Sequence, residues 1–152
     1  MKKNVIKLLG IFALVFSMLG LTACSTTEAA NDDFGPKHKL VIQVSSSDAL
    51  TQKIAMNNAV NVQKAYGVDN VAVEIVAYGP GLSMLTKKSE YSNRVQSLAV
   101  QGITFSACGN TIKKVAKKKG KTPKLSEGVV VVSAGVVRIM ELQEKGYSYI
   151  RP

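Results

Sequence analysis

Residues 102–111 read Gly-Ile-Thr-Phe-Ser-Ala-Cys-Gly-Asn-Thr, and this stretch joins a strand to a helix. Ile103 to Ala107 is a mostly apolar run of strand length, and Gly109 permits a tight turn directly behind it. A lysine-rich helix is predicted to start near Asn110 and to end by Gly120. The stretch therefore predicts one strand-to-helix unit of an α/β fold.

The same pattern recurs along the chain on both sides of this unit. Strands are predicted at residues 39–44, 71–77, 129–132 and 147–150, and helices at residues 48–66, 89–101 and 135–145. The four consecutive valines at 129–132 are typical of a strand that is buried on both faces. Strands that alternate with helices of this length favour right-handed crossovers and a parallel sheet. We expect a three-layer α/β/α sandwich with a mainly parallel five-stranded sheet.

The first residues have the pattern of a bacterial lipoprotein signal. Lysines at positions 2, 3 and 7 precede an uncharged run of 14 residues, Leu8 to Leu21, which is short for a membrane span. The run ends in Leu-Thr-Ala-Cys, which resembles the bacterial lipobox. The resemblance implies a diacylglyceryl group on Cys24, cleavage just before it, and acylation of the new amine. The alternatives are an uncleaved anchor helix or a soluble secreted protein.

Three segments are therefore expected: a signal peptide at 1–23, a lipidated flexible tether at 24–37, and one folded domain at 38–152. Loss of three lysines with the signal peptide lowers the formal charge from +10 to +7. We expect the mature chain to be held in the cell envelope by lipid on Cys24. Ser25 in place of aspartate resembles outer-membrane sorting, facing the periplasm, in an organism with two membranes.

Small, polar and glycine-rich segments follow the predicted strands. In a parallel sheet, ligands bind beyond the carboxyl ends of the strands, so these segments are candidates for shaping a site. The sequence 78–81, Tyr-Gly-Pro-Gly, is predicted to be a plain turn, because glycine and proline disfavour regular elements. Site-shaping positions are expected at the following residues: Ser46, Tyr78, Gly79, Gly81, Gly109, Asn110 and Thr111.

Cys108 is the candidate reactive group. Once Cys24 carries lipid, Cys108 has no cysteine left to pair with, so it is either buried and inert or present for its chemistry. Asn110 or Thr111 can cap the helix that follows it. At a helix N-terminus, free amide groups and the positive end of the helix dipole favour the thiolate, which is the nucleophilic form. The alternative is a small packing residue at the end of a strand.

Two other features are weaker candidates. His38, the only histidine, is expected at the start of the first strand, at the opposite end of the sheet from Cys108. No cluster has metal-ligand spacing, so no metal or cofactor is expected. The lysine-rich segment 113–124 is either a solvated face or a contact for anionic lipid, an acidic partner or an anionic substrate. It lacks the aromatic and arginine partners of a nucleic-acid site.

Three segments resemble the DsrE/DsrF-like family: 73–81, 102–111 with its Cys-Gly-Asn-Thr, and 135–152 with Gly-Tyr-Ser-Tyr-Ile. The similarity extends from about Lys39 to the last residue. It implies a parallel α/β sandwich, often assembled as trimers or hexamers, and a link to sulfur metabolism. In the sulfur-relay members, a cysteine at the position of Cys108 carries sulfur as a persulfide and passes it to a partner thiol protein. Those members work in the cytoplasm, whereas this chain carries a lipobox.

Three functions follow as hypotheses. The first is an envelope lipoprotein that handles sulfane sulfur on Cys108, as a sulfurtransferase or sulfur carrier. The second is a non-catalytic oligomeric binding or scaffold module in which Cys108 only packs. The third is a lysine-rich surface that docks on the membrane or on another envelope polymer.

Overall fold

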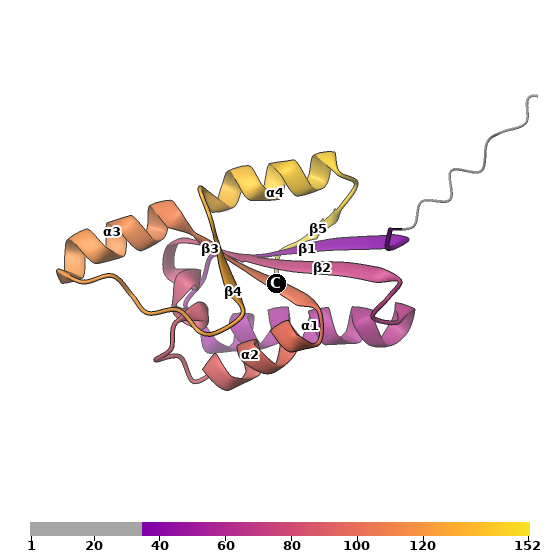
Figure 1. Ribbon diagram of the computed structural model, residues 1–152, viewed down its shortest axis with the longest axis horizontal. Coiled ribbons are helices and arrows are strands. Elements are labelled where there is room, and N and C mark those ends of the chain that lie inside the picture. The colour runs from indigo at the N-terminus through magenta and orange to yellow at the C-terminus, as the bar shows by residue number, and fades with distance from the viewer. Residues whose placement is uncertain (1–34) are drawn as a thin grey trace, which may run out of the picture. The chain divides into compact units, whose positions relative to one another are not determined.

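The computed structural model describes residues 35–152 (Figure 1). The predicted signal peptide, Cys24 and most of the predicted tether lie outside the described residues. The elements, in chain order, are β1 (His38–Val44), α1 (Ala49–Tyr66), β2 (Val71–Ala77), η1 (Gly79–Leu85), α2 (Ser92–Val100), β3 (Ile103–Cys108), α3 (Gly109–Lys119), β4 (Val129–Val132), α4 (Gly135–Glu144) and β5 (Ser148–Ile150). None of the described helices is both long and apolar enough to cross a membrane.

The five strands form one parallel sheet in the order β4-β3-β2-β1-β5. From β1 to β4 the chain moves stepwise toward one edge. The connection through α4 then runs back across the sheet to β5 at the other edge. With right-handed crossovers, a reversal of direction places the connecting helix on the opposite face. The predicted α/β fold with a mainly parallel five-stranded sheet is therefore confirmed.

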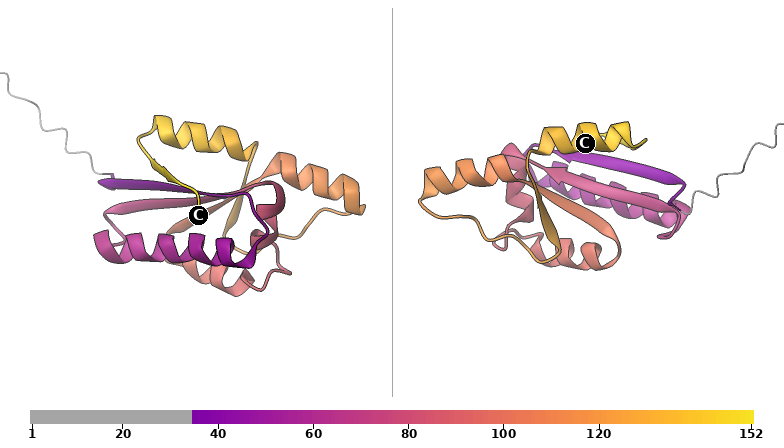
Figure 2. Two further views of the ribbon diagram at one scale, coloured as in Figure 1. Left: turned by 180° about the vertical axis from the view of Figure 1, so that it is seen from behind. Right: turned by 45° about the horizontal axis from the view of Figure 1, so that its top comes forward.

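Helices cover the sheet on two sides (Figures 1 and 2). The larger core lies on the side of α1, α2 and η1, where Met56, Leu85 and Phe105 are fully buried. A smaller cluster on the other side packs Ile139 and Leu142 of α4 against Val41 and Val76. α3 has no buried residue and projects past the carboxyl ends of the strands, with Ile112 and Val115 resting against the larger core.

Two of the sequence predictions are wrong. The segment 78–81 is not a plain turn, because Gly79–Leu85 forms a 3-10 helix with Pro80 at its start, where a missing amide hydrogen is harmless. The strand Val129–Val132 is not buried on both faces. It is an edge strand, and Val130 and Val131 are 48% and 60% exposed. Four valines fit a strand in either place, so composition did not decide between the centre and the edge of the sheet.

The predicted helix boundaries differ from those in the structure by only a few residues. Asp48 caps α1 by accepting a hydrogen bond from the Thr51 amide at 2.7 Å, and Gly67 ends α1 with φ of 84°. α2 starts at Ser92 rather than at Ser89, because the Ser89 hydroxyl accepts from the Tyr91 amide in the preceding turn. The N-cap of α3 is Cys108 itself, instead of the expected Asn110 or Thr111.

Candidate functional site

Cys108 lies at the end of β3, next to β4, and the helices that follow these two strands lie on different faces of the sheet. β3 leads into α3, which rests on the larger core, whereas the adjacent β4 leads into α4 on the other face. Clefts between the carboxyl ends of such strands are where α/β proteins bind ligands. The Asn110 amide donates to the Ser133 carbonyl at 3.3 Å, so the first turn of α3 lies against the end of β4. The N-termini of α3 and α4 therefore meet at Cys108.

The surroundings of the Cys108 sulfur favour its charged form. Burial raises the pKa of the Cys108 thiol, but hydrogen bonds from the Thr111 hydroxyl and from the amides of Gly135, Thr111 and Asn110 lower it by more. The net pKa lies below the ordinary cysteine value. The donors belong to the first turns of two helices, where amides have no partner within the helix. The residue is only 6% exposed, so the sulfur lies just below the surface.

A contact with Gly79, at the start of η1, orients the Thr111 side chain. Its Oγ1 accepts a hydrogen bond from the Gly79 amide at 2.9 Å. Because that contact uses a lone pair of the oxygen, the hydroxyl hydrogen remains available for the sulfur of Cys108. Gly79 and Thr111, two of the predicted site-shaping residues, are thus brought together with Cys108.

Two glycines, Gly135 and Gly109, allow neighbouring segments to pack closely around Cys108. A Cβ on Gly135 would lie 3.0 Å from the Cβ and Cδ1 of Tyr78, so its absence lets the start of α4 approach Tyr78. A Cβ on Gly109 would lie 3.0 Å from the Val132 carbonyl oxygen. Tyr78 and Gly109 therefore shape the site through packing. Gly135 is not among the predicted site residues, although it begins the helix that follows the predicted strand 129–132.

The remaining predicted residues lie farther along the sheet or at the surface. The Asn110 side chain is exposed, and only the backbone amide of Asn110 helps to lower the pKa of Cys108. Ser46 belongs to the loop after β1, two strands from β3, where its carbonyl accepts from Gln52. Gly81 packs against the end of β1, since a Cβ there would lie 2.1 Å from the Val44 carbonyl oxygen. His38 begins β1 and stacks on Tyr66, at the opposite end of the sheet from Cys108, as expected.

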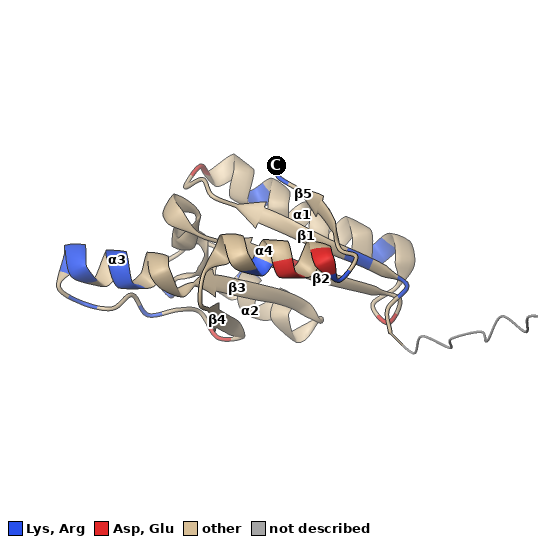
Figure 3. Ribbon diagram, turned by 90° about the horizontal axis from the view of Figure 1, so that it is seen from above, with Lys and Arg blue, Asp and Glu red and all other residues tan. Residues whose placement is uncertain are grey.

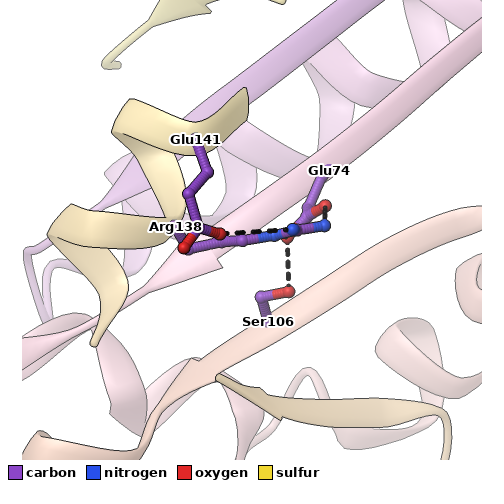
Figure 4. A network of polar contacts seen from close by, with 4 residues as sticks. All are labelled: Glu74, Ser106, Arg138 and Glu141. Atoms are coloured by element: carbon purple, nitrogen blue, oxygen red, sulfur yellow. Dashed lines mark hydrogen bonds and ion pairs between the residues drawn. The ribbon is translucent and has the colours of Figure 1, made fainter. Parts of the chain in front are cut away.

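Sequence reasoning missed a buried ion pair on the α4 face (Figure 4). Arg138 of α4 donates from Nε and from one terminal nitrogen to the two carboxylate oxygens of Glu74 on β2, each at 2.8 Å. Ser106 of β3 donates to the same carboxylate at 2.6 Å. The Glu74 side chain is 5% exposed and that of Arg138 is 28% exposed. The pair fixes α4 to the sheet one turn beyond Gly135, whose amide faces Cys108.

Removing the Thr111 hydroxyl tests this description of the thiol. In Thr111→Val, the pKa of Cys108 should rise, because burial then opposes ionisation with one donor fewer. Thiolate is the reactive form, so the alkylation rate levels off only above the pKa, and the midpoint of its pH profile should move to higher pH. At pH 7 the rate should fall about three- to tenfold, because a smaller fraction of the thiol is ionised. The more basic thiolate is the better nucleophile, which offsets only part of this loss. Thr111→Ser keeps the donor and should leave the midpoint unchanged, and equal midpoints in all three proteins would contradict the assignment.

No site for a metal ion is apparent in residues 35–152, where no three His, Cys, Asp or Glu side chains are grouped to hold one.

Comparison with curated proteins finds no match. Among solved structures, the chain is similar to a protein of unknown function from Methanobacterium thermoautotrophicum, MTH1491. The two share 35% sequence identity and a TM-score of 0.68 over 76% of this chain and 99% of the other. Residues 38–152 match the model of the DsrE/DsrF-like family. The chain belongs to the DsrE/DsrF-like family.

Proposed function

We propose that this protein is an envelope lipoprotein that carries sulfane sulfur as a persulfide on Cys108. The observation that supports it is the group of donors around the sulfur: two helix N-termini and the Thr111 hydroxyl lower the pKa of the one cysteine among the described residues. Family membership adds a second argument, since the sulfur-relay members carry persulfide on a cysteine at this position. Cys108 is the proposed catalytic residue, and Gly109, Asn110, Thr111, Tyr78 and Gly79 shape its surroundings.

The proposed chemistry is an exchange of sulfur without net oxidation. The Cys108 thiolate attacks the outer sulfur of a donor persulfide, R–S–SH. A new S–S bond forms, the donor S–S bond breaks, and the donor leaves as the thiolate R–S⁻. In a second exchange, an acceptor thiolate attacks the outer sulfur and regenerates the Cys108 thiolate. The Thr111 hydroxyl and the amides of Gly135 and Thr111 stabilise the negative sulfur before the first exchange and after the second.

The place of action and the assembly are part of the proposal. Lipid on Cys24 would hold the domain at a membrane of the cell envelope, the outer membrane if the organism has two, with residues 25–37 as a tether. Assembly into a homo-oligomer, a trimer or hexamer, is supported by apolar surface on α4 and on the edge strand β4. Val131, Val136 and Met140 are each more than half exposed there. A partner thiol protein would receive the sulfur.

The burial of Cys108 favours one alternative. At 6% exposure the residue also fits a packing role, and the domain would then be an oligomeric binding or scaffold module without sulfur chemistry. Under this alternative, Cys108→Ser should preserve every measurable property of the protein.

Intact mass after exposure to a sulfane donor separates the two functions. The purified protein would be incubated with polysulfide or a small-molecule persulfide, beside Cys108→Ser. We expect a sulfur-sized mass increase on the wild type, complete loss of that increase in the variant, and its removal by reductant. A wild-type thiol that gains no sulfur, and that resists alkylation until the protein is unfolded, would support the packing module and refute sulfur transfer.

A further inference from the structure

A concave site lies beside α3, formed by segments that are distant in sequence. It is a cleft of about 640 Å³ between η1, the residues that follow it, the outer half of α3 and the loop 121–124. Cys108 is not among its lining residues. A cleft of this size falls in the range of small-molecule sites in proteins.

The lining combines an apolar floor with positive charge. Pro80, Leu82, Val115 and Pro123 supply the apolar part, and five lysines surround it: Lys87, Lys88, Lys119, Lys121 and Lys124. No acidic residue lines the cleft. In Figure 3, the lysines of α3 and of the following loop gather at the end of the molecule beyond the carboxyl ends of the strands.

Backbone contacts hold the two walls together. The Lys87 amide donates to the Lys124 carbonyl at 2.9 Å, and the Ser126 amide donates to the Leu85 carbonyl at 2.9 Å. Thr86 and Leu125 form an antiparallel bridge between these contacts. Gly120, in the left-handed region at φ of 68°, ends α3 and turns the chain back toward the cleft. The cleft is therefore a fixed feature of the fold rather than a gap between loose loops.

Most of the positive charge in the cleft is uncompensated. Lys87 pairs with Glu127 at 3.4 Å, whereas the other lysines of the cleft form no ion pair within residues 35–152. Holding several cations around one hollow costs electrostatic repulsion, which an anion in the cleft would relieve. The apolar floor would cover the body of such a ligand.

We infer that this cleft binds a soluble organic polyanion: an apolar or aromatic body that carries two or more phosphate, sulfate or sulfonate groups. A concave lining with an apolar floor distinguishes it from a flat basic face that would lie on a membrane. Gly79 lines the cleft and also contacts Thr111, so the cleft adjoins the surroundings of Cys108. Cys108 itself does not line the cleft, so binding there does not require the Cys108 thiol.

The chain offers a matched pair of variants for the test. Lys119→Gln/Lys121→Gln removes two charges that line the cleft. Lys117→Gln/Lys118→Gln removes two charges of α3 that do not line the cleft. All four lysines are exposed, so both variants should fold. The probe is pyranine, a fluorescent pyrene trisulfonate, titrated into the full-length protein and into Cys108→Ser.

We expect pyranine to bind the wild type and Cys108→Ser equally, and to bind more weakly as salt is raised. Lys119→Gln/Lys121→Gln should weaken binding about three- to tenfold, whereas Lys117→Gln/Lys118→Gln should change it less than twofold. Equal losses in both variants would mean a diffuse positive field and would overturn the inference. Failure to bind pyranine, together with binding to phosphatidylglycerol vesicles, would also overturn it in favour of a membrane surface.

Discussion

Arg138→Met should lower the free energy of unfolding by about 3–5 kcal/mol at pH 7, because it leaves the Glu74 carboxylate buried without its cation. Glu74 lies in the middle of β2, and apart from Arg138 it accepts a hydrogen bond from Ser106. One hydroxyl does not compensate a charge that is removed from water. Denaturant titrations of the wild type and of Arg138→Met at pH 7 measure this difference.

Two further variants separate the ion pair from simple packing. Glu74→Met/Arg138→Met removes both charges, and should restore most of the stability that the single variant loses. Glu141→Gln removes only the exposed partner of Arg138 at 3.6 Å, and should cost less than about 1 kcal/mol. If Arg138→Met and Glu141→Gln cost the same, the buried pair does not hold α4 as argued.

The ion pair also connects stability with the thiol. Arg138 sits in the first turn of α4, and the Gly135 amide at the start of that helix donates to the sulfur of Cys108. A helix that is no longer fixed to β2 would hold this donor less firmly. Alkylation profiles of Arg138→Met should therefore show a midpoint at higher pH than the wild type, provided that the variant is folded.

The fold could be predicted from sequence because strands and helices alternate along the chain with clear periodicity. The apolar runs at 71–77 and 103–107 and the glycines at 67 and 120 placed elements to within a few residues. The location of β4 could not be predicted. Four valines suit either the centre or the edge of a sheet, and strand order depends on which face each connecting helix covers, a tertiary property.

The site could be predicted only in part for a similar reason. Cys108 and its helix were apparent because a strand ended there and a helix began. The contribution of Gly135 and the contact of Gly79 with Thr111 join segments that are far apart in sequence. One feature of the sequence does indicate the ion pair. Glu74 is a lone charge within an apolar strand, and a buried charge of this kind requires a partner. The partner, Arg138, lies 64 residues later, and nothing in the sequence around it identifies it as the partner of Glu74.

Gly81→Ala should destabilise the protein by about 3 kcal/mol, the upper part of the range for overpacking. A Cβ at this position would lie 2.1 Å from the carbonyl oxygen of Val44 and 2.6 Å from its carbon. Both atoms belong to the backbone of a central strand, so no side-chain rotation relieves the clash, and η1 must move away from β1. Thermal unfolding should show a fall in Tm of roughly 10 °C.

The neighbouring Gly79→Ala provides the matched comparison. Its Cβ would meet nothing within 4 Å, but φ of 55° lies in the left-handed region, so the expected cost is conformational, about 1–2 kcal/mol. The two variants should also differ at Cys108. Displacement of η1 in Gly81→Ala would draw the Gly79 amide away from Thr111 and shift the thiol's alkylation midpoint to higher pH. Gly79→Ala keeps η1 in place and should retain the wild-type midpoint. If both variants lose the same stability and keep the same midpoint, the close approach of η1 to β1 does not position Thr111.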